Sequence, residues 1–346
     1  PFVIGRARPS GLVLNDRAIS RSHCRLDHDG DRLLLTDLNS TNGTYLNGVR
    51  LSAPSLLPDG ALIRIGAHML RYLRRAPEQV EEEAALEREL KEATEYVAAI
   101  LPAPLTTGAV RTEWFFQPST QLSGDAFGYQ WLDDRWFSVF MLDVAGHGTA
   151  AALHAVSVAN SIRHKLLPEA DFRNPASVLQ SLNRVFSMEH HDERFFTIWY
   201  GAYDRETRTL HYAGGGHHPA YVVLPPGLIP AGMPGADPAE PTVATLPGCV
   251  AVPTPLSTRN PAIGIALDGP VKTGTATIPP GSTLHLFSDG AFEVATRTGQ
   301  PLGLPEFVAL LPTAGSPGGS RWLYDTVRAR AGQPEDDFSL LVLRFA

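Results

Sequence analysis

Residues 137–148 read FSVFMLDVAGHG and contain the pattern on which the fold of the larger part of this chain depends. The apolar run before Asp143 predicts a buried strand. An aspartate at the end of such a strand is costly to bury unless a charged partner compensates it. The Gly-His-Gly that follows allows a sharp turn, and the small residues after it predict the start of a helix. This arrangement is suited to holding an ion, although a strand-to-helix turn capped by Asp143 explains the same letters.

Three further acidic motifs accompany this one. The four are Ser123-Gly124-Asp125, Asp143-Val144-Ala145-Gly146-His147-Gly148, Ser288-Asp289-Gly290 and Asp336-Asp337-Phe338-Ser339. Carboxylates gathered without cationic side chains repel one another unless a divalent ion lies among them. Oxygen ligands favour Mg²⁺ or Mn²⁺ over zinc, and the Cys-His spacing of a zinc site is absent from the sequence. Two such ions can lower the pKa of a shared water and present it to phosphorus.

The length and composition predict an ordinary globular protein of two domains. The chain has 346 residues, of which 43 % are apolar and 19 % charged. Its formal charge of −7 provides no basic field, so nucleic acid and an anionic membrane surface are not expected partners. The two cysteines, Cys24 and Cys249, suit a reducing cytoplasm. We find no signal peptide and no apolar run of membrane-spanning length, and we expect a cytoplasmic protein.

Residues 1–75 consist of short alternating runs separated by turn residues, a spacing typical of an all-β sandwich. The runs predicted to form strands are 2–4, 12–14, 24–26, 32–35, 44–46, 61–65 and 68–73. Polar residues concentrate in the loops, where a rigid sandwich usually carries its binding sites. Arginine together with hydroxyl and amide donors is the chemistry of phosphate recognition, although turn formation alone explains the Asn-Gly pairs.

Three loop motifs in a fixed order make this region specific. They are Gly5-Arg6, Ser20-Arg21-Ser22-His23, and Ser40-Thr41-Asn42-Gly43-Thr44 with Asn47-Gly48. Residues 2–73 resemble the forkhead-associated (FHA) domain, a phosphothreonine-binding module. The resemblance implies that Arg6, Ser20 and Thr41 contact the phosphate, that Arg21 supports it, and that Asn42 and Asn47 hold the peptide backbone. It gives His23 a structural role. Because this family has β-structure ahead of the Gly-Arg motif, we expect an N-terminally truncated domain and a fragment of a longer protein.

Residues 76–107 predict a helical linker. The segment from Pro77 is rich in Glu, Ala and Leu, and Pro102 and Pro104 end the helix. Apolar residues recur at the 4-3-4-3 spacing of a heptad seam, at Leu86, Leu90, Ala93, Val97 and Ile100. A polar helix needs a partner for such a stripe, so we expect a parallel coiled coil and a homodimer. Packing of the stripe on either domain is the alternative.

Residues 108–346 predict a second domain of mixed strands and helices. Strands are expected over 114–117, 137–143, 284–288 and 338–345, helices over 148–167 and 175–189, and a three-strand meander over 195–204, 209–213 and 220–224. Residues 214–219, Gly-Gly-Gly-His-His-Pro, are expected to form the last turn of that meander, with His217 and His218 as turn residues. The Pro- and Gly-rich residues 225–261 predict either a functional flap or a disordered insertion.

This second domain is similar to the metal-dependent Ser/Thr protein phosphatases (PPM, the protein phosphatase 2C superfamily), and within it to the bacterial SpoIIE branch. Residues 99–102, 196–197 and 213–219 add to the four acidic motifs in carrying the resemblance. It implies an α+β domain with an α-β-β-α sandwich, two Mn²⁺ or Mg²⁺ ions, and hydrolysis of phosphoserine or phosphothreonine on a protein.

The resemblance also implies a role for each acidic residue. Asp143 would bridge the two metals, the Val144 carbonyl would bind one of them, Asp289 and Asp336 would bind the other, and Asp125 would ligate directly or through water. Asp337 would support them, and His147 is a candidate to protonate the leaving alkoxide. Many relatives have a further acid where this chain has Gly128, which puts one metal site in question.

We therefore predict a bacterial signalling phosphatase in which an FHA domain (1–75) and a linker (76–107) precede a SpoIIE-like PPM domain (108–346). The resemblance implies a phosphoprotein substrate such as an anti-sigma-factor antagonist, and a phosphothreonine protein such as a Ser/Thr kinase as FHA ligand. The alternative is a pseudophosphatase that serves as a phosphothreonine-binding scaffold, which Gly128 favours. A nucleotide-binding loop at 143–148 would lack the lysine and hydroxyl that it needs.

Overall fold

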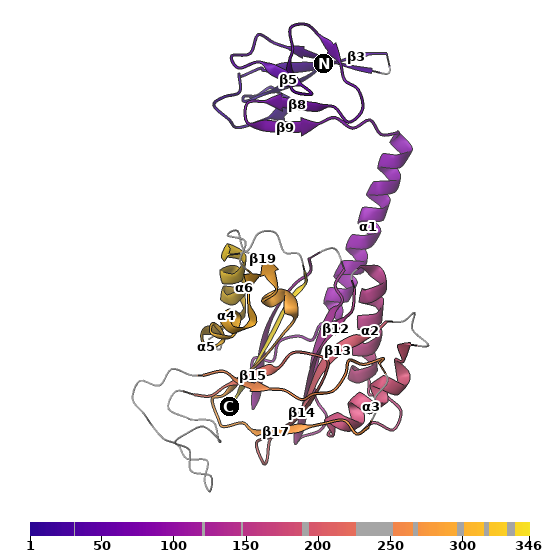
Figure 1. The fold of residues 1–346 in the computed structure, drawn as a ribbon, viewed down its shortest axis with the longest axis vertical. Helices are drawn as coiled ribbons and strands as arrows, with labels where there is room; N and C mark the ends of the chain where they lie inside the picture. The colour runs from indigo at the N-terminus through magenta and orange to yellow at the C-terminus, as the bar shows by residue number, and fades with distance from the viewer. Residues whose placement is uncertain are drawn as a thin grey trace. The chain divides into compact units, whose positions relative to one another are not determined.

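The computed structural model describes residues 1–30, 32–119, 122–146, 148–188, 194–225, 252–265, 269–295, 301–314, 318–330 and 336–346. These residues divide into two units, Pro1–Glu87 and Arg88–Ala346, with helix α1 (Pro77–Ile100) crossing the division (Figure 1). Most of the Pro- and Gly-rich segment, residues 226–251, lies outside the described residues. None of the helices in the described part of the chain has the length and apolar character of a membrane-spanning segment.

The first unit is a β-sandwich of two sheets (Figure 1). One sheet has the order β2 (Leu12–Val13), β1 (Phe2–Gly5), β3 (Cys24–Asp29), β4 (Arg32–Asp37), β7 (Ser55–Leu56), and the other β6 (Val49–Arg50), β5 (Thr44–Leu46), β8 (Leu62–Ile65), β9 (His68–Arg71). The alternation expected of half-buried strands is clear in β8, where Ile63 and Ile65 are buried while Leu62 is exposed. Ile4, Cys24 and Leu35 from the first sheet complete this core. The loops at the strand ends are therefore carried on a rigid frame.

The second unit contains two five-stranded antiparallel sheets. The first sheet has the order β11 (Asp125–Trp131), β12 (Trp136–Val144), β13 (Phe196–Asp204), β14 (Thr209–Gly215), β17 (Gly274–Thr277). The second has the order β10 (Val110–Gln117), β21 (Phe338–Phe345), β18 (Thr283–Phe287), β15 (Ala220–Val223), β16 (Thr254–Leu256). A short hairpin pairs β19 (Val294–Ala295) with β20 (Pro301–Leu302). The apolar run before Asp143 thus forms a buried strand between β11 and β13, and the prediction of a buried strand is confirmed.

Three apolar cores hold the sheets and helices of this unit together. Phe127, Met141 and Trp199 of the first sheet pack in one core with Leu284 and Leu341 of the second sheet. Helices α2 (Thr149–Arg163) and α3 (Pro175–Val185) cover the outer face of the first sheet. Helices α4 (Leu304–Val308), α5 (Leu311–Ala314) and α6 (Gly319–Arg330) cover the second sheet, and a 3-10 turn (Asp289–Ala291) follows β18. The predicted α-β-β-α sandwich is confirmed.

The predicted three-strand meander is wrong in its last strand. β13 and β14 pair as expected, but β15 lies in the other sheet, between β18 and β16. The chain therefore crosses from one sheet to the other through residues 214–219. Gly216 allows the crossing, because its φ is +72° and an added Cβ would lie 2.9 Å from Ala262. Strands adjacent in sequence usually pair, and this turn is an exception to that tendency.

Glu113 on β10 holds the start of helix α6. Its carboxylate accepts hydrogen bonds from the backbone of Gly318 (3.1 Å), from the backbone of Ser320 (3.1 Å), and from Arg344 (2.8 Å). Burial raises the pKa of Glu113, but the hydrogen bonds from Ser320 and Arg344 outweigh it and lower the pKa below its usual value. A carboxylate from a strand thus accepts backbone N–H groups at the start of α6, as a capping side chain does.

Candidate functional site

Carboxylates from both sheets of the second unit lie at strand ends. Asp125 begins β11 and pairs in register directly with Asp143, one residue before the end of β12. Asp289 follows β18, and Asp336 and Asp337 immediately precede β21. Strands β18 and β21 are neighbours in the second sheet. The fold therefore brings the four acidic motifs of the sequence to adjacent strand ends.

These carboxylates act on one another electrostatically. Burial, followed by the charge of Asp143, raises the pKa of Asp125 well above its usual value. Burial raises the pKa of Asp143 to about 7, with contributions from the charges of Asp289, Asp336 and Asp337. Burial and the charge of Glu293 raise the pKa of Asp289. Like charges directly opposite each other across two strands are destabilising, so this cluster requires a compensating positive charge.

Gly124 leaves an open approach to backbone oxygen atoms beside this cluster. A Cβ at residue 124 would lie 3.0 Å from the Val144 carbonyl oxygen and 3.3 Å from that of Gly146. The Gly124 carbonyl in turn accepts the backbone N–H of Val144 at 3.2 Å. A glycine is therefore needed where two carbonyl oxygens and the aspartates meet, and these are the hard oxygen donors that Mg²⁺ and Mn²⁺ prefer.

The donor types and their mutual repulsion fit a divalent-metal site. In the described ranges, however, no group of three or more carboxylate, imidazole or thiol side chains is arranged so that it could hold an ion as it stands. The fit is one of donor chemistry and charge, and the side chains do not form a closed coordination shell.

Asp337 has a different role from its neighbour Asp336. One of its carboxylate oxygens accepts the backbone N–H (2.7 Å) and hydroxyl (2.9 Å) of Ser119, and the other accepts the backbone N–H of Gly124 at 3.1 Å. Asp337 is buried, whereas Asp336 is exposed. Asp337 thus ties the turn before Asp125 to the start of β21, and its supporting role toward a metal stays a prediction.

Gly128 faces away from the carboxylates. Side chains alternate along a strand, so residues 125 and 128 of β11 lie on opposite faces of the sheet. A Cβ at residue 128 would lie 2.6 Å from the ring of Phe140, which belongs to the core under helices α2 and α3. An acid at this position would displace that ring, so packing explains Gly128 without reference to metal binding.

The sequence predicts that His147 acts as an acid and that His217 and His218 are turn residues. His217 and His218 do lie between β14 and β15. His147 lies outside the described residues, so its role stays a prediction. Burial lowers the pKa of His217 to about 3 and that of His218 to about 4, so both imidazoles are neutral at pH 7. The ring of His218 stacks on Phe287 with a centroid distance of 4.6 Å. Neither Nε2 atom has a hydrogen-bond partner in the part of the chain that the structure describes.

The loops of the first unit are joined by hydrogen bonds. The Arg6 backbone donates to the Ser20 carbonyl at 3.0 Å, and the Thr41 backbone donates to Ser20 Oγ at 3.1 Å. The Ser20 and Thr41 hydroxyls lie 3.4 Å apart. Asn42 Nδ2 donates to the Ala18 carbonyl at 2.7 Å. Four of the predicted phosphopeptide residues, Arg6, Ser20, Thr41 and Asn42, therefore lie in contiguous loops.

Gly5, His23 and Asn47 shape this surface. A Cβ at Gly5 would lie 2.1 Å from the carbonyl oxygen of Arg21, so glycine alone permits this approach of the loops. His23 is fully buried, accepts the Ser20 backbone N–H at Nδ1 (3.1 Å), and contacts the Gly43 carbonyl through Nε2 (3.2 Å). Asn47 bonds the Leu62 backbone through Oδ1 at 2.8 Å, in the turn between β5 and β6. Arg6 and Arg21 are exposed.

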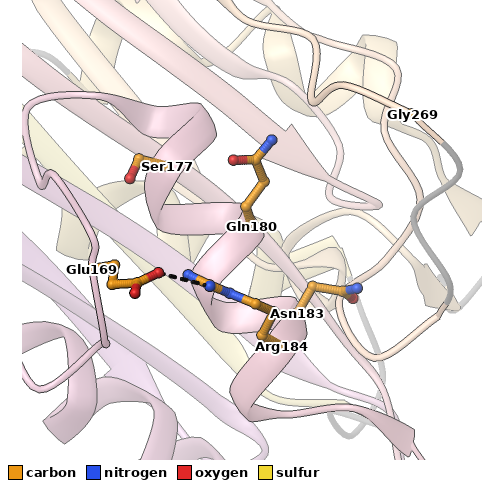
Figure 2. A pocket seen from close by; sticks show the side chains of 6 residues that line it. All are labelled: Glu169, Ser177, Gln180, Asn183, Arg184 and Gly269. Carbon is orange, nitrogen blue, oxygen red and sulfur yellow. Dashed lines mark hydrogen bonds and ion pairs between the residues drawn. The ribbon is translucent and has the colours of Figure 1, made fainter.

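A polar cavity of about 570 Å³ lies elsewhere, on the outer side of α3 (Figure 2). Its lining comprises Glu169, Ser177, Gln180, Asn183, Arg184 and Gly269. Arg184 pairs with Glu169 at 3.0 Å, and Asn183 accepts the Gly264 backbone N–H at 2.8 Å. None of the strand-end carboxylates belongs to this lining.

Two antiparallel sheets between two helix layers, with carboxylates at the strand ends, define the architecture of a protein phosphatase 2C domain. The SiaA-PP2C domain of Pseudomonas aeruginosa has the same fold, with a TM-score of 0.60 and 21 % identity over 77 % of this chain and 99 % of that domain.

The model of the family described as stage II sporulation protein E (SpoIIE) matches residues 133–346, more than half of the chain, and the chain belongs to this family. The model described as the FHA domain matches residues 2–66. This chain is 27 % identical to the phosphoserine phosphatase RsbP of Bacillus subtilis (strain 168) over 137 residues, which are 38 % of this chain and 33 % of RsbP. It is 46 % identical over 66 residues to the FHA domain-containing protein FhaB of Mycolicibacterium smegmatis, covering 19 % of this chain and 43 % of FhaB. The chain thus spans less than half the length of each of these two relatives.

Proposed function

We propose that the chain is a metal-dependent phosphatase that hydrolyses phosphoserine or phosphothreonine on a protein in bacterial signalling. The observation that carries the proposal is the cluster of carboxylates from four strand ends, where burial and then the charges of Asp289, Asp336 and Asp337 raise the pKa of Asp143 to about 7. Membership of the SpoIIE family and the similarity to a phosphoserine phosphatase support the same reaction. An anti-sigma-factor antagonist is the substrate class that the family suggests.

Two Mn²⁺ or Mg²⁺ ions are the cofactor that this donor set suits. Asp143, the Val144 carbonyl, Asp289 and Asp336 would hold these ions, and Asp125 would act directly or through water. When bound, such ions supply an activated water for attack on phosphorus and neutralise developing charge. The protein contributes the fixed carboxylates, the opening beside Gly124, and Asp337, which holds the turn before Asp125.

Turnover of p-nitrophenyl phosphate by the whole chain tests this proposal. We expect hydrolysis with Mn²⁺, loss of hydrolysis when a chelator is added, and recovery when excess Mn²⁺ is returned, because the carboxylates alone have no electrophile to offer. A phosphoserine peptide should be hydrolysed under the same conditions. If neither substrate is hydrolysed at any Mn²⁺ concentration, the chain is instead a pseudophosphatase scaffold. The close approach of Gly128 to Phe140 gives a packing reason for this glycine, which supports the phosphatase over that alternative.

The first unit is proposed to bind phosphothreonine peptides and so to target or regulate the phosphatase. Contiguous loops with exposed Arg6 and Arg21 and with the hydroxyls of Ser20 and Thr41 supply the charge-assisted donors that a phosphate needs. A Ser/Thr kinase that carries phosphothreonine is the partner class this suggests.

Helix α1 is proposed to form a parallel dimer. Its apolar seam is poorly covered within the chain, since Leu86 is 57 % exposed and Leu90, Ala93, Val97 and Ile100 are partly exposed. An isolated polar helix gains little stability without a partner for such a stripe.

The end of α1 is bonded to elements that lead to the carboxylates. Arg163, in the last turn of α2, donates to the Ile100 carbonyl. Trp114 Nε1 donates to the Pro102 carbonyl at 2.9 Å, and the Tyr129 hydroxyl donates to the Ala103 carbonyl at 2.9 Å. Tyr129 lies on β11, the strand that begins with Asp125. A change in α1 on dimerisation therefore has a bonded route to Asp125, and the ligand must distinguish the two states for coupling to occur.

Replacement of Leu90 by Lys should convert the dimer to a monomer and uncouple phosphopeptide binding from turnover, because a seam lysine is poorly tolerated in a tight helix pair. Sedimentation at micromolar concentration and turnover with and without phosphopeptide measure the two effects. Ala84→Lys, on the same helix but outside the seam, adds the same charge and should leave the dimer intact. A monomeric wild-type chain whose turnover ignores saturating phosphopeptide would show that α1 is only a tether.

A further inference from the structure

We infer that Ser339 is a positioning residue for Asp125, an inference that rests on the proposed metal-dependent function. The Ser339 hydroxyl donates a hydrogen bond to Asp125 Oδ2 at 2.6 Å. Ser339 is fully buried and Asp125 is 4 % exposed. The two residues belong to different sheets, Ser339 to β21 and Asp125 to β11. This hydrogen bond therefore crosses the interior of the sandwich to a proposed metal ligand.

The position of Ser339 is itself fixed by Ser288. The Ser339 backbone donates to Ser288 Oγ at 3.0 Å, and the Ser288 backbone donates to the Ser339 carbonyl at 3.0 Å. The Ser288 hydroxyl donates to the Asp337 carbonyl at 2.9 Å. The Ser288 hydroxyl thus bonds within the second sheet, and it also acts on the Asp125 carboxyl as a hydrogen-bond partner. Ser339 makes the 2.6 Å hydrogen bond to Asp125 and is the stronger of the two partners.

A short hydrogen bond from a hydroxyl to a carboxylate is stronger than one between neutral groups and fixes the plane of the carboxylate. Asp125 pairs in register with Asp143. The plane of the Asp125 carboxylate therefore sets which of its oxygens is turned toward the Asp143 side chain. Without the Ser339 hydroxyl, the buried Asp125 carboxylate loses a donor and is held less firmly in the orientation proposed to bind metal. Outer-sphere donors of this kind commonly tune metal affinity.

The inference is tested by the affinity of the whole chain for Mn²⁺ alone, measured by calorimetry without substrate. We expect Ser339→Ala to weaken Mn²⁺ binding by about 10- to 100-fold. Ser339→Thr retains the hydroxyl and should bind within a few-fold of wild type. Turnover should also distinguish the two variants. Ser339→Ala should need more Mn²⁺ for half-maximal turnover, while its rate at saturating Mn²⁺ approaches that of wild type.

Ser138→Ala is the matched control. Ser138 is 1 % exposed on β12, and its hydroxyl donates to the Gln130 carbonyl at 3.4 Å, away from the carboxylates. It should leave Mn²⁺ affinity unchanged, and thermal unfolding of the metal-free variants compares the general cost of removing a buried hydroxyl. Equal Mn²⁺ affinity of Ser339→Ala and wild type, or an equal loss in Ser138→Ala, overturns the inference and leaves the proposed function standing. If the wild type binds no Mn²⁺, the proposed function itself fails.

Discussion

Replacing Asp143 by Asn should lower the turnover number by at least about 100-fold while the protein remains folded. Asn has the same shape as Asp but carries no charge, so the bridging position of the proposed metal site loses its strongest donor. The metal-free variant should be at least as stable as wild type, since Asp143 stands opposite Asp125 and like charges so placed are destabilising. Turnover at saturating Mn²⁺ and the melting temperature without metal measure the two effects.

Asp204→Asn provides the matched control for this result. Asp204 ends β13, is 3 % exposed, and accepts a hydrogen bond from Arg135 at 2.8 Å. The hydrogen bonds from Arg135 lower the pKa of Asp204, which marks it as a stabilising carboxylate. Its replacement should lower the melting temperature and leave turnover unchanged, the reverse of Asp143→Asn. Wild-type turnover in Asp143→Asn would contradict the assignment of the metal site.

The expected loss depends on a strand whose position could be read from the sequence. The run before Asp143 is uninterrupted by polar or turn residues apart from Ser138, and a strand buried on both faces has that character. The helices at 148–167 and 175–189 and the strand at 338–345 were predictable for similar reasons, although α2 and α3 end four residues earlier than expected.

Other elements lacked a signal of this strength. The strand Asp125–Trp131 contains a glycine and a glutamine and begins with a carboxylate, so its apolar pattern is broken. Helix α6 has few apolar residues and takes its cap from Glu113, which is about 200 residues away in sequence. The sequence placed β15 beside β14 because a glycine-rich turn normally joins neighbours, and only the packing of the two sheets decides otherwise.

Some features of the candidate site could likewise be predicted from the sequence, and others could not. The four acidic motifs identify the carboxylates, because charge at strand ends is visible in the letters. The orientation of Gly128 could have been inferred from alternation along β11, but that strand was not predicted. The hydrogen bond from Ser339 to Asp125 could not have been inferred from the sequence, because it joins residues 214 positions apart in different sheets. A hydroxyl two residues after Asp337 is too common a pattern to carry that information.

Replacing Arg6 by Ala should weaken the binding of a phosphothreonine peptide by at least about 100-fold. Arg6 follows β1 and is exposed. Its backbone N–H donates to the carbonyl of Ser20, the residue whose hydroxyl lies 3.4 Å from that of Thr41. A guanidinium supplies two charge-assisted hydrogen bonds to phosphate, whereas the two hydroxyls supply only neutral donors. Calorimetry with phosphorylated and unphosphorylated forms of one peptide measures the change.

Arg25→Ala separates a phosphate contact from a general loss of positive charge on the same unit. Arg25 lies on β3 and forms an ion pair with Asp27 at 2.6 Å, so its charge is already compensated within the strand. Both variants remove one guanidinium, but only Arg6→Ala should abolish the preference for the phosphorylated peptide. If the peptide were held only by long-range attraction to the positive charge of this unit, the two variants would lose similar, small amounts of affinity. Both losses would then vanish at high salt. Equal affinity of the wild-type chain for both forms of the peptide would contradict phosphothreonine recognition by these loops, because the charge-assisted donors of Arg6 distinguish the two forms only through the phosphate.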